Sequence, residues 1–147
     1  MAPVEALAAF SAPRSVPPAP LAVLVVDDHA VVRESLAILI ESTEGFALWG
    51  TAESGEDALA QLHAQTPRPR IALLDLSMGG MGGIGLLERV RATWPEMACV
   101  VLSAHQASIY SPQAAQAGAR AYVEKGDPDE LLSVLRDIGA DGGAPEL

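Results

Sequence analysis

Short aliphatic runs alternate with segments of helical period along most of this 147-residue chain, five times in succession. An uninterrupted aliphatic run is typical of a strand buried on both faces, and a helical segment after each strand supplies the cover. The linkers between the segments are too short for connections other than βα units. The alternation therefore predicts an α/β fold with a doubly wound, five-stranded parallel sheet and five helices.

The expected elements follow from the apolar pattern and from the residues that bound it. We predict strands over 21–26, 46–51, 71–75, 97–102 and 119–123. We predict helices over 29–43, 55–65, 83–93, 111–117 and 128–138. Ser54 can cap the second helix, and Gly45 and Gly118 follow the first and fourth helices in the positions of C-terminal caps.

Pro112 affects the expected start of the fourth helix. An interior proline removes a helical hydrogen bond and costs about 3 kcal/mol, whereas a proline at the first helical position costs little. We therefore expect Ser111 to be the cap and Pro112 the first residue of a short helix, with 105–110 as a loop before it.

The chain is long enough for one domain with a tail at each end. Residues 1–20 contain five prolines and lack the pattern of a secretory signal, so we expect a disordered tail there. Residues 139–147 are rich in glycine and alanine and are expected to form a flexible tail or the start of a linker. The predicted domain spans 21–138.

Charge and composition exclude several classes of function. The net charge of −10 removes the electrostatic basis for nucleic-acid binding by this domain alone. The longest aliphatic run, over 21–26, is far shorter than the ~20 residues of a membrane span. Cys99 is the single cysteine, which excludes an internal disulfide and suits a reducing compartment, so we expect a cytoplasmic location.

Polar residues mark the carboxyl ends of four predicted strands. They are Asp27 and Asp28, Asp75, Ser103 and, just after the fifth strand, Lys125. Ligands of open α/β sheets bind at this edge, so we expect these side chains to converge.

Their chemistry favours a metal-assisted reaction with phosphate. Three crowded carboxylates repel one another unless a hard cation lies among them, and oxygen ligands suit Mg²⁺ or Mn²⁺. Asp75 could then act as a nucleophile toward phosphorus, with Ser103 and Lys125 contacting the phosphoryl oxygens. His29 and His105 are interpreted as solvated residues rather than metal ligands.

Four segments resemble the response-regulator receiver domain of two-component signalling. They are LVVDDHAVVRESL, LLDLSMGGMGG, VVLSAH and GARAYVEKG, in the same order and spacing as in that family over about 21–138. The resemblance implies a flavodoxin-like sheet of strand order 2-1-3-4-5. The DDH start followed by Arg33 is most similar to receivers that precede LuxR-type helix-turn-helix output domains, which implies transcription regulation if such a domain follows.

The resemblance also assigns roles to residues. It implies that Asp75 accepts a phosphoryl group from a histidine kinase or a phosphotransfer protein. Asp28, Asp75 and the backbone carbonyl of Ser77 would bind Mg²⁺ directly, and Asp27 would act through water. Three further residues would form the switch: Ser103, Lys125 and Tyr122. The switch would act on the face formed by the fourth helix, the fifth strand and the fifth helix, and this face can support a homodimer.

Two other functions remain possible from the residues. The five glycines over 79–85 depart from the family pattern and suggest a receiver that acts by protein contacts without phosphorylation. A metal-dependent phosphohydrolase is the third possibility, although Ser77 stands where such enzymes usually carry a second carboxylate. A receiver that is not itself an enzyme is the preferred interpretation.

Overall fold

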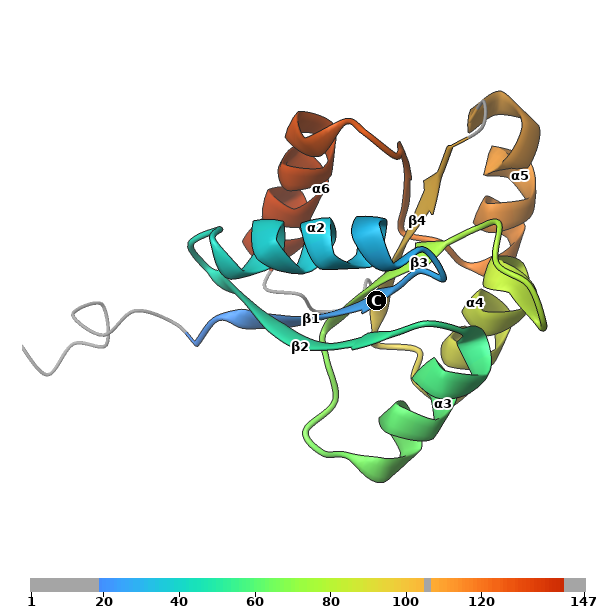
Figure 1. The fold of residues 1–147 in the computed structure, drawn as a ribbon, viewed down its shortest axis with the longest axis horizontal. Coiled ribbons are helices and arrows are strands. Elements are labelled where there is room, and N and C mark those ends of the chain that lie inside the picture. Colours follow the sequence, from blue (N-terminus) through green and yellow to red (C-terminus); the bar gives the residue numbers. More distant parts are fainter. Residues whose placement is uncertain (1–18, 105–106, 142–147) are drawn as a thin grey trace, which may run out of the picture.

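The computed structural model describes residues 19–104 and 107–141, which form alternating strands and helices (Figure 1). The strands are β1 (Leu21–Val26), β2 (Phe46–Ala52), β3 (Ile71–Asp75), β4 (Ala98–Ser103) and β5 (Ala121–Glu124). The helices are α2 (Ala30–Glu41), α3 (Gly55–Ala64), α4 (Gly82–Thr93), α5 (Ala107–Ala117) and α6 (Pro128–Ala140). His105 and the outer parts of both predicted tails lie outside the described residues.

All five strands pair in parallel, in the order β2-β1-β3-β4-β5, which confirms the predicted topology. The chain therefore reverses direction of winding between β1 and β3. In that pairing Val26 lies opposite Leu74, so the residues that follow them, Asp27 and Asp75, lie at the same level of the sheet edge. The register of β1 and β3 thus places these two residues side by side.

Two apolar clusters cover the sheet, one on each face. Helices α2 and α6 lie on one face, and α3, α4 and α5 lie on the other (Figure 1). The first cluster contains Val23, Leu73 and Leu135, and the second contains Leu24, Leu74 and Leu87. The alternation of neighbouring residues between the two clusters is that of a strand buried on both sides.

Local capping chemistry agrees with the sequence in three places. The Ser54 hydroxyl accepts a hydrogen bond from the Asp57 backbone N–H at 3.0 Å and so caps α3. Gly45 and Gly118 have φ values of 94° and 102°, a left-handed conformation that a glycine adopts at no steric cost.

The prediction that a short fourth helix begins at Pro112 is wrong. Helix α5 runs from Ala107 to Ala117 with Pro112 inside it. The fixed φ of proline is compatible with α-helical backbone, so the disruption is confined to one missing N–H donor and the crowding of the preceding turn. A helix can therefore extend N-terminal to the proline.

Most other boundaries differ from expectation by one or two residues, and two of these differences have a visible structural reason. The Ala119 N–H donates to Ala114 O at 2.9 Å, which keeps that residue with the end of α5, and β5 starts only at Ala121. Helix α6 continues two residues past the expected end at 138, where Gly139 packs near Leu21 and Phe46. None of the described helices is long and apolar enough to cross a membrane.

The glycine-rich segment after β3 has geometric reasons for three of its glycines. Gly80 and Gly82 have positive φ values of 66° and 75°. Gly83 approaches the end of β3 so closely that an added Cβ would lie 2.7 Å from Leu76 Cα and closer still to the Asp75 carbonyl oxygen. The start of α4 is thus packed directly against the backbone that carries Asp75.

We expect Gly83→Ala to lower the free energy of unfolding by about 1–3 kcal/mol, because the added methyl group must displace the β3 backbone. Gly79→Ala is the matched control, since Gly79 has no atom within 4 Å of its ideal Cβ and no positive φ. The control should change stability by no more than about 0.5 kcal/mol. Urea unfolding followed by circular dichroism measures both, and equal losses would contradict the packing argument.

Candidate functional site: an acidic cluster at the sheet edge

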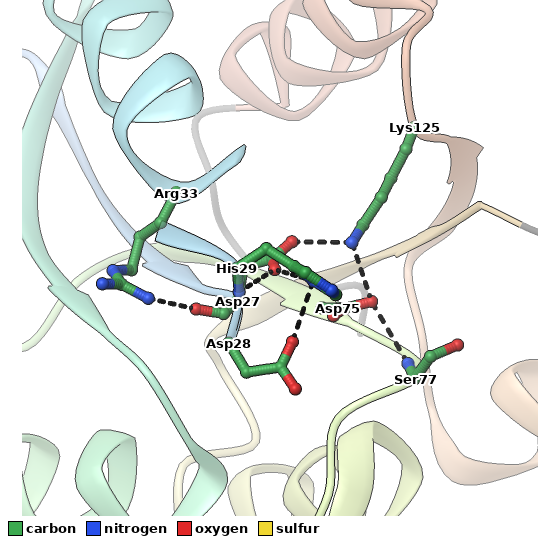
Figure 2. A network of polar contacts seen from close by, with 7 residues as sticks. All are labelled: Asp27, Asp28, His29, Arg33, Asp75, Ser77 and Lys125. Carbon is green, nitrogen blue, oxygen red and sulfur yellow. Dashed lines mark hydrogen bonds and ion pairs between the residues drawn. The ribbon is translucent and has the colours of Figure 1, made fainter. Parts of the chain in front are cut away.

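Four of the five predicted strand-end residues meet at the carboxyl edge of the sheet: Asp27, Asp28, Asp75 and Lys125 (Figure 2). Asp27 follows β1 and donates its backbone N–H to Ala52 O of β2 at 3.1 Å. Asp75 ends β3. Both carboxylates are buried, Asp27 completely and Asp75 with 1% of its surface exposed, whereas the Asp28 side chain is 39% exposed. The result is a cluster of negative charge at the carboxyl edge of the sheet.

The Lys125 ammonium joins the two buried carboxylates. Its Nζ lies 2.8 Å from Asp27 Oδ2 and 3.2 Å from Asp75 Oδ1. The Lys125 backbone N–H donates to Ser103 O at 2.8 Å, which extends the β4–β5 pairing to the point where the side chain turns into the site. Burial by itself lowers the pKa of Lys125, but Asp27 and Asp75 together outweigh that effect, so its pKa is raised and the lysine is charged at neutral pH.

Asp27 is held by contacts on both oxygens and on its backbone. Its Oδ1 accepts the His29 backbone N–H at 2.8 Å, and Oδ2 faces Lys125. The Arg33 Nη1 donates to the Asp27 carbonyl oxygen at 2.7 Å, which ties the first turn of α2 to the end of β1. Asp27 therefore has less freedom to change partners than Asp28.

Asp75 is held on one oxygen only. Its Oδ1 accepts the Ser77 backbone N–H at 3.1 Å and faces Lys125. Its Oδ2 is buried and has no hydrogen-bond partner within the described residues. A buried, unsatisfied carboxylate oxygen is costly unless a ligand completes it, and this orphaned atom points to one.

Burial raises the pKa of Asp75, and the charge of Asp27 raises it further, while the Ser77 N–H and Lys125 oppose the shift. A raised pKa makes the ionised carboxylate a stronger base and a better nucleophile than an ordinary aspartate.

The donor set fits a divalent cation. Asp27, Asp28, His29 and Asp75 each offer one ligand atom, and these atoms all lie within 4.8 Å of one another. The excess of carboxylates over Lys125 leaves net negative charge that a cation would neutralise.

Ser103 and Tyr122 lie on neighbouring strands beside this cluster. Ser103 ends β4 and is completely buried. Tyr122, in β5, packs against the apolar cluster under α4, and its hydroxyl is buried without a hydrogen-bond partner in the described part of the chain. Cys99 is also buried, and burial raises its pKa to about 12, so this thiol is an inert core residue.

A comparison with protein-family models identifies residues 23–136 as a response regulator receiver domain. The chain belongs to that family. The match covers all five strands in full or nearly so, and the site lies within it.

Curated relatives agree with this assignment. The receiver is 32% identical over 117 residues to the response regulator UvrY of Escherichia coli, covering 79% of this chain and 53% of UvrY. It is 32% identical over 119 residues to the response regulator GacA of Pseudomonas aeruginosa, covering 80% of this chain and 55% of GacA. The chain thus spans about half the length of these relatives.

Solved structures support the fold. A LuxR-family response regulator from an Aurantimonas species matches with a TM-score of 0.76 and 32% identity, covering 84% of this chain and 87% of that one. CheY in the CheX–CheY–BeF₃–Mg complex from Borrelia burgdorferi matches with a TM-score of 0.75 and 26% identity, covering 82% and 90%. The receiver fold and the LuxR-type resemblance are thereby confirmed.

Two residues that contact the acidic cluster are not among the expected site residues. Arg33 donates to the Asp27 carbonyl oxygen, and the His29 ring faces both Asp27 and Asp28, although it is 66% exposed and so agrees with the interpretation as a solvated residue (Figure 2). The DDHxxxR spacing places His29 at the start of a helix and Arg33 one turn later, and that spacing was the available signal.

We expect Asp28→Ala to reduce Mg²⁺ affinity more than Asp27→Asn, because Asp28 is the more exposed and less engaged carboxylate of the pair. The family resemblance implies that Asp28 is a direct ligand and that Asp27 acts through water, so loss of Asp28 should weaken binding by at least tenfold and loss of Asp27 by less. Isothermal titration calorimetry measures both. Equal losses in the two variants would contradict the ordering.

Proposed function

We propose that this receiver accepts a phosphoryl group on Asp75 from a histidine kinase or a phosphotransfer protein and signals through the resulting change in its surface. The observation that carries the proposal is the asymmetry of Asp75: Oδ1 is held by Ser77 and Lys125, while Oδ2 is buried without a partner among the described residues. The unpartnered oxygen is the nucleophile. In the transfer it forms the new bond to phosphorus as the phosphorus–nitrogen bond of the donor histidine breaks.

The surrounding residues would prepare this oxygen and receive the incoming charge. Lys125 holds Oδ1 and lies where it can contact a phosphoryl oxygen, and Ser103 follows Leu102, the residue that pairs with Asp75 on the next strand. Asp28, Asp75 and the Ser77 carbonyl would hold Mg²⁺ or Mn²⁺, with Asp27 acting through water. When bound, the cation neutralises the phosphoryl oxygens that approach three carboxylates. The presence of BeF₃ and Mg in the similar Borrelia CheY complex supports this part.

The output would pass through Ser103 and Tyr122. Movement of the Ser103 hydroxyl toward the phosphoryl group would vacate space beside β5, into which the partly buried Tyr122 ring can turn. The face of α5, β5 and α6 would then change its preference for a second copy of the chain or another partner. Transcription regulation by an attached output domain and a cytoplasmic location complete the proposal. It treats the receiver as regulatory rather than enzymatic.

We expect Asp75→Asn to abolish acid-labile labelling by acetyl phosphate in the presence of Mg²⁺, because an amide oxygen cannot form the acyl phosphate. Asp129→Asn, an exposed change in α6, is the control and should label like the wild type. Undiminished labelling of D75N would exclude Asp75. Absence of labelling in the wild type would favour a receiver that acts without phosphorylation.

A protein phosphodonor has an apolar surface to contact beside this site. A groove of about 390 Å³ lies between α2 and the segment from β5 to α6, with Lys125 in its wall. Val31 lines it and is 76% exposed. Few other large apolar side chains in the described part of the chain are so exposed. A helix carrying the donor histidine could pack there and bring the histidine to Asp75.

We expect Val31→Glu to slow phosphotransfer from a histidine kinase or phosphotransfer protein by about tenfold or more, because a charge replaces an apolar contact. Labelling by acetyl phosphate should not change, since the small donor needs no docking surface. Ile38→Glu is the matched control: Ile38 is 66% exposed on the same helix but does not line the groove. Equal slowing in both variants would place the donor elsewhere.

A further inference from the structure

An exposed glutamate at the start of α3 contacts the glycine-rich turn that follows Asp75. The Met81 backbone N–H donates to Glu56 Oε2 at 3.3 Å. The same carboxylate lies against Gly80, because an ideal Cβ on that glycine would stand 3.0 and 3.1 Å from its two oxygens. Glu56 therefore joins α3 to the turn through which the chain passes from the acidic cluster to α4.

The Met81 side chain makes the reciprocal contact. An ideal Cβ on Gly55, the first residue of α3, would lie 2.6 Å from both Met81 Cγ and Met81 Sδ. Met81 thus lies on the backbone of Gly55, while the neighbouring Glu56 lies on the backbone of Gly80. Each contact needs a glycine on the opposite side, since a larger residue would separate the two segments. These four residues form an interlock between α3 and the turn.

Local propensity does not fix the conformation of this turn. Four of the five residues 79–83 are glycine, the residue that loses most conformational freedom on folding. A hydrogen bond from the Gly83 N–H to Leu76 O at 3.4 Å closes the turn at its base. Contacts with other elements must hold its middle, and Glu56 supplies one to the backbone.

The conformation of the turn matters to the site because the turn includes Ser77. The Ser77 N–H holds Asp75 Oδ1 at 3.1 Å, and the Ser77 carbonyl is one of the proposed metal ligands. Gly80 follows Ser77 after only two intervening residues, and one of them, Met78, is anchored in the core with 8% of its surface exposed. A change at Gly80 can therefore reach Ser77, and groups that orient ligands must hold them to within about 0.5 Å.

We propose that Glu56 is a positioning residue of the phosphorylation site. By holding Gly80 and Met81 it fixes the turn that presents the Ser77 backbone to Asp75 and to the cation. The inference rests on the proposed function, because the cation and the phosphoryl group are those of that proposal. Glu56 acts as a hydrogen-bond acceptor and not through its charge, since its partner is a backbone N–H.

Three variants separate the hydrogen bond from the charge. Glu56→Ala removes the acceptor and should weaken Mg²⁺ binding, measured by calorimetry, by about threefold or more. It should raise the Mg²⁺ concentration for half-maximal labelling by acetyl phosphate to the same extent and leave the rate at saturating Mg²⁺ within about twofold of the wild type. Glu56→Gln keeps an acceptor oxygen and should match the wild type. Asp129→Ala, the control, also removes an acidic residue from the first turn of a helix, but in α6, and should match it too.

Amide hydrogen exchange of Met81 in the metal-free chain reports the contact directly. Glu56→Ala should speed this exchange and Glu56→Gln should not. Thermal unfolding of each variant verifies that the fold is retained.

Two results would overturn the inference and leave the proposed function standing, provided that the wild type is labelled. One is wild-type Mg²⁺ affinity in Glu56→Ala. The other is a loss in Glu56→Gln as large as in Glu56→Ala, because the charge would then be responsible. A wild type that binds Mg²⁺ without being labelled would overturn the proposed function, while the affinities would still decide the role of Glu56. A wild type that does not bind Mg²⁺ would overturn both.

Discussion

The ion pairs of Lys125 with Asp27 and Asp75 are the interaction on which the rest of the site depends. Two buried carboxylates at the ends of adjacent strands repel each other, and removing a charge partner from such a site is strongly destabilising. Lys125 compensates one oxygen of each at 2.8 and 3.2 Å. Because one ammonium cannot neutralise two buried carboxylates and Asp28, the folded chain retains uncompensated negative charge where a cation and a phosphoryl group are proposed to bind.

Hydrogen bonds and close packing hold the backbone around this charge. Asp27 is fixed by its own N–H on β2, by the His29 N–H and by Arg33 on its carbonyl. Asp75 ends a strand whose five residues are all buried, and Gly83 packs against its backbone. Three of the glycines after β3 are required here, two by positive φ values and one by its close approach to the β3 backbone. The packing of the two apolar clusters thus offsets the unfavourable free energy of the crowded carboxylates, as is common at functional sites.

The sequence predicted the parts that depend on periodicity and on strand ends. Buried parallel strands are recognisable as aliphatic runs, so β1 and β3 were located to the residue, and the convergence of Asp27, Asp75 and Lys125 followed from topology. Boundaries that depend on a single hydrogen bond were not predictable, such as the Ala119 N–H that delays β5. The helical start before Pro112 and the inward turn of the His29 ring depend on tertiary surroundings, which local propensity does not contain. The roles assigned to Ser77, Ser103 and Tyr122 remain predictions from the family resemblance.

Strand β4 offers a physical route from the acidic cluster to the surface. Its Leu102 carbonyl accepts the Leu76 N–H at 2.9 Å, just after Asp75, and its Ser103 carbonyl accepts the Lys125 N–H at 2.8 Å. The end of β4 is therefore hydrogen-bonded on one side to Leu76, next to the proposed phosphoacceptor Asp75. On the other side it is bonded to Lys125, which directly follows β5 and its Tyr122. A displacement of Ser103 toward Asp75 would pull on both bonds, and the Tyr122 ring, whose buried hydroxyl has no partner within the described chain, is not held by a hydrogen bond against following it. In the proposed switch, the energy difference between the two states then depends on how well that hydroxyl is satisfied in each, because an unmade buried hydrogen bond costs about 1–3 kcal/mol.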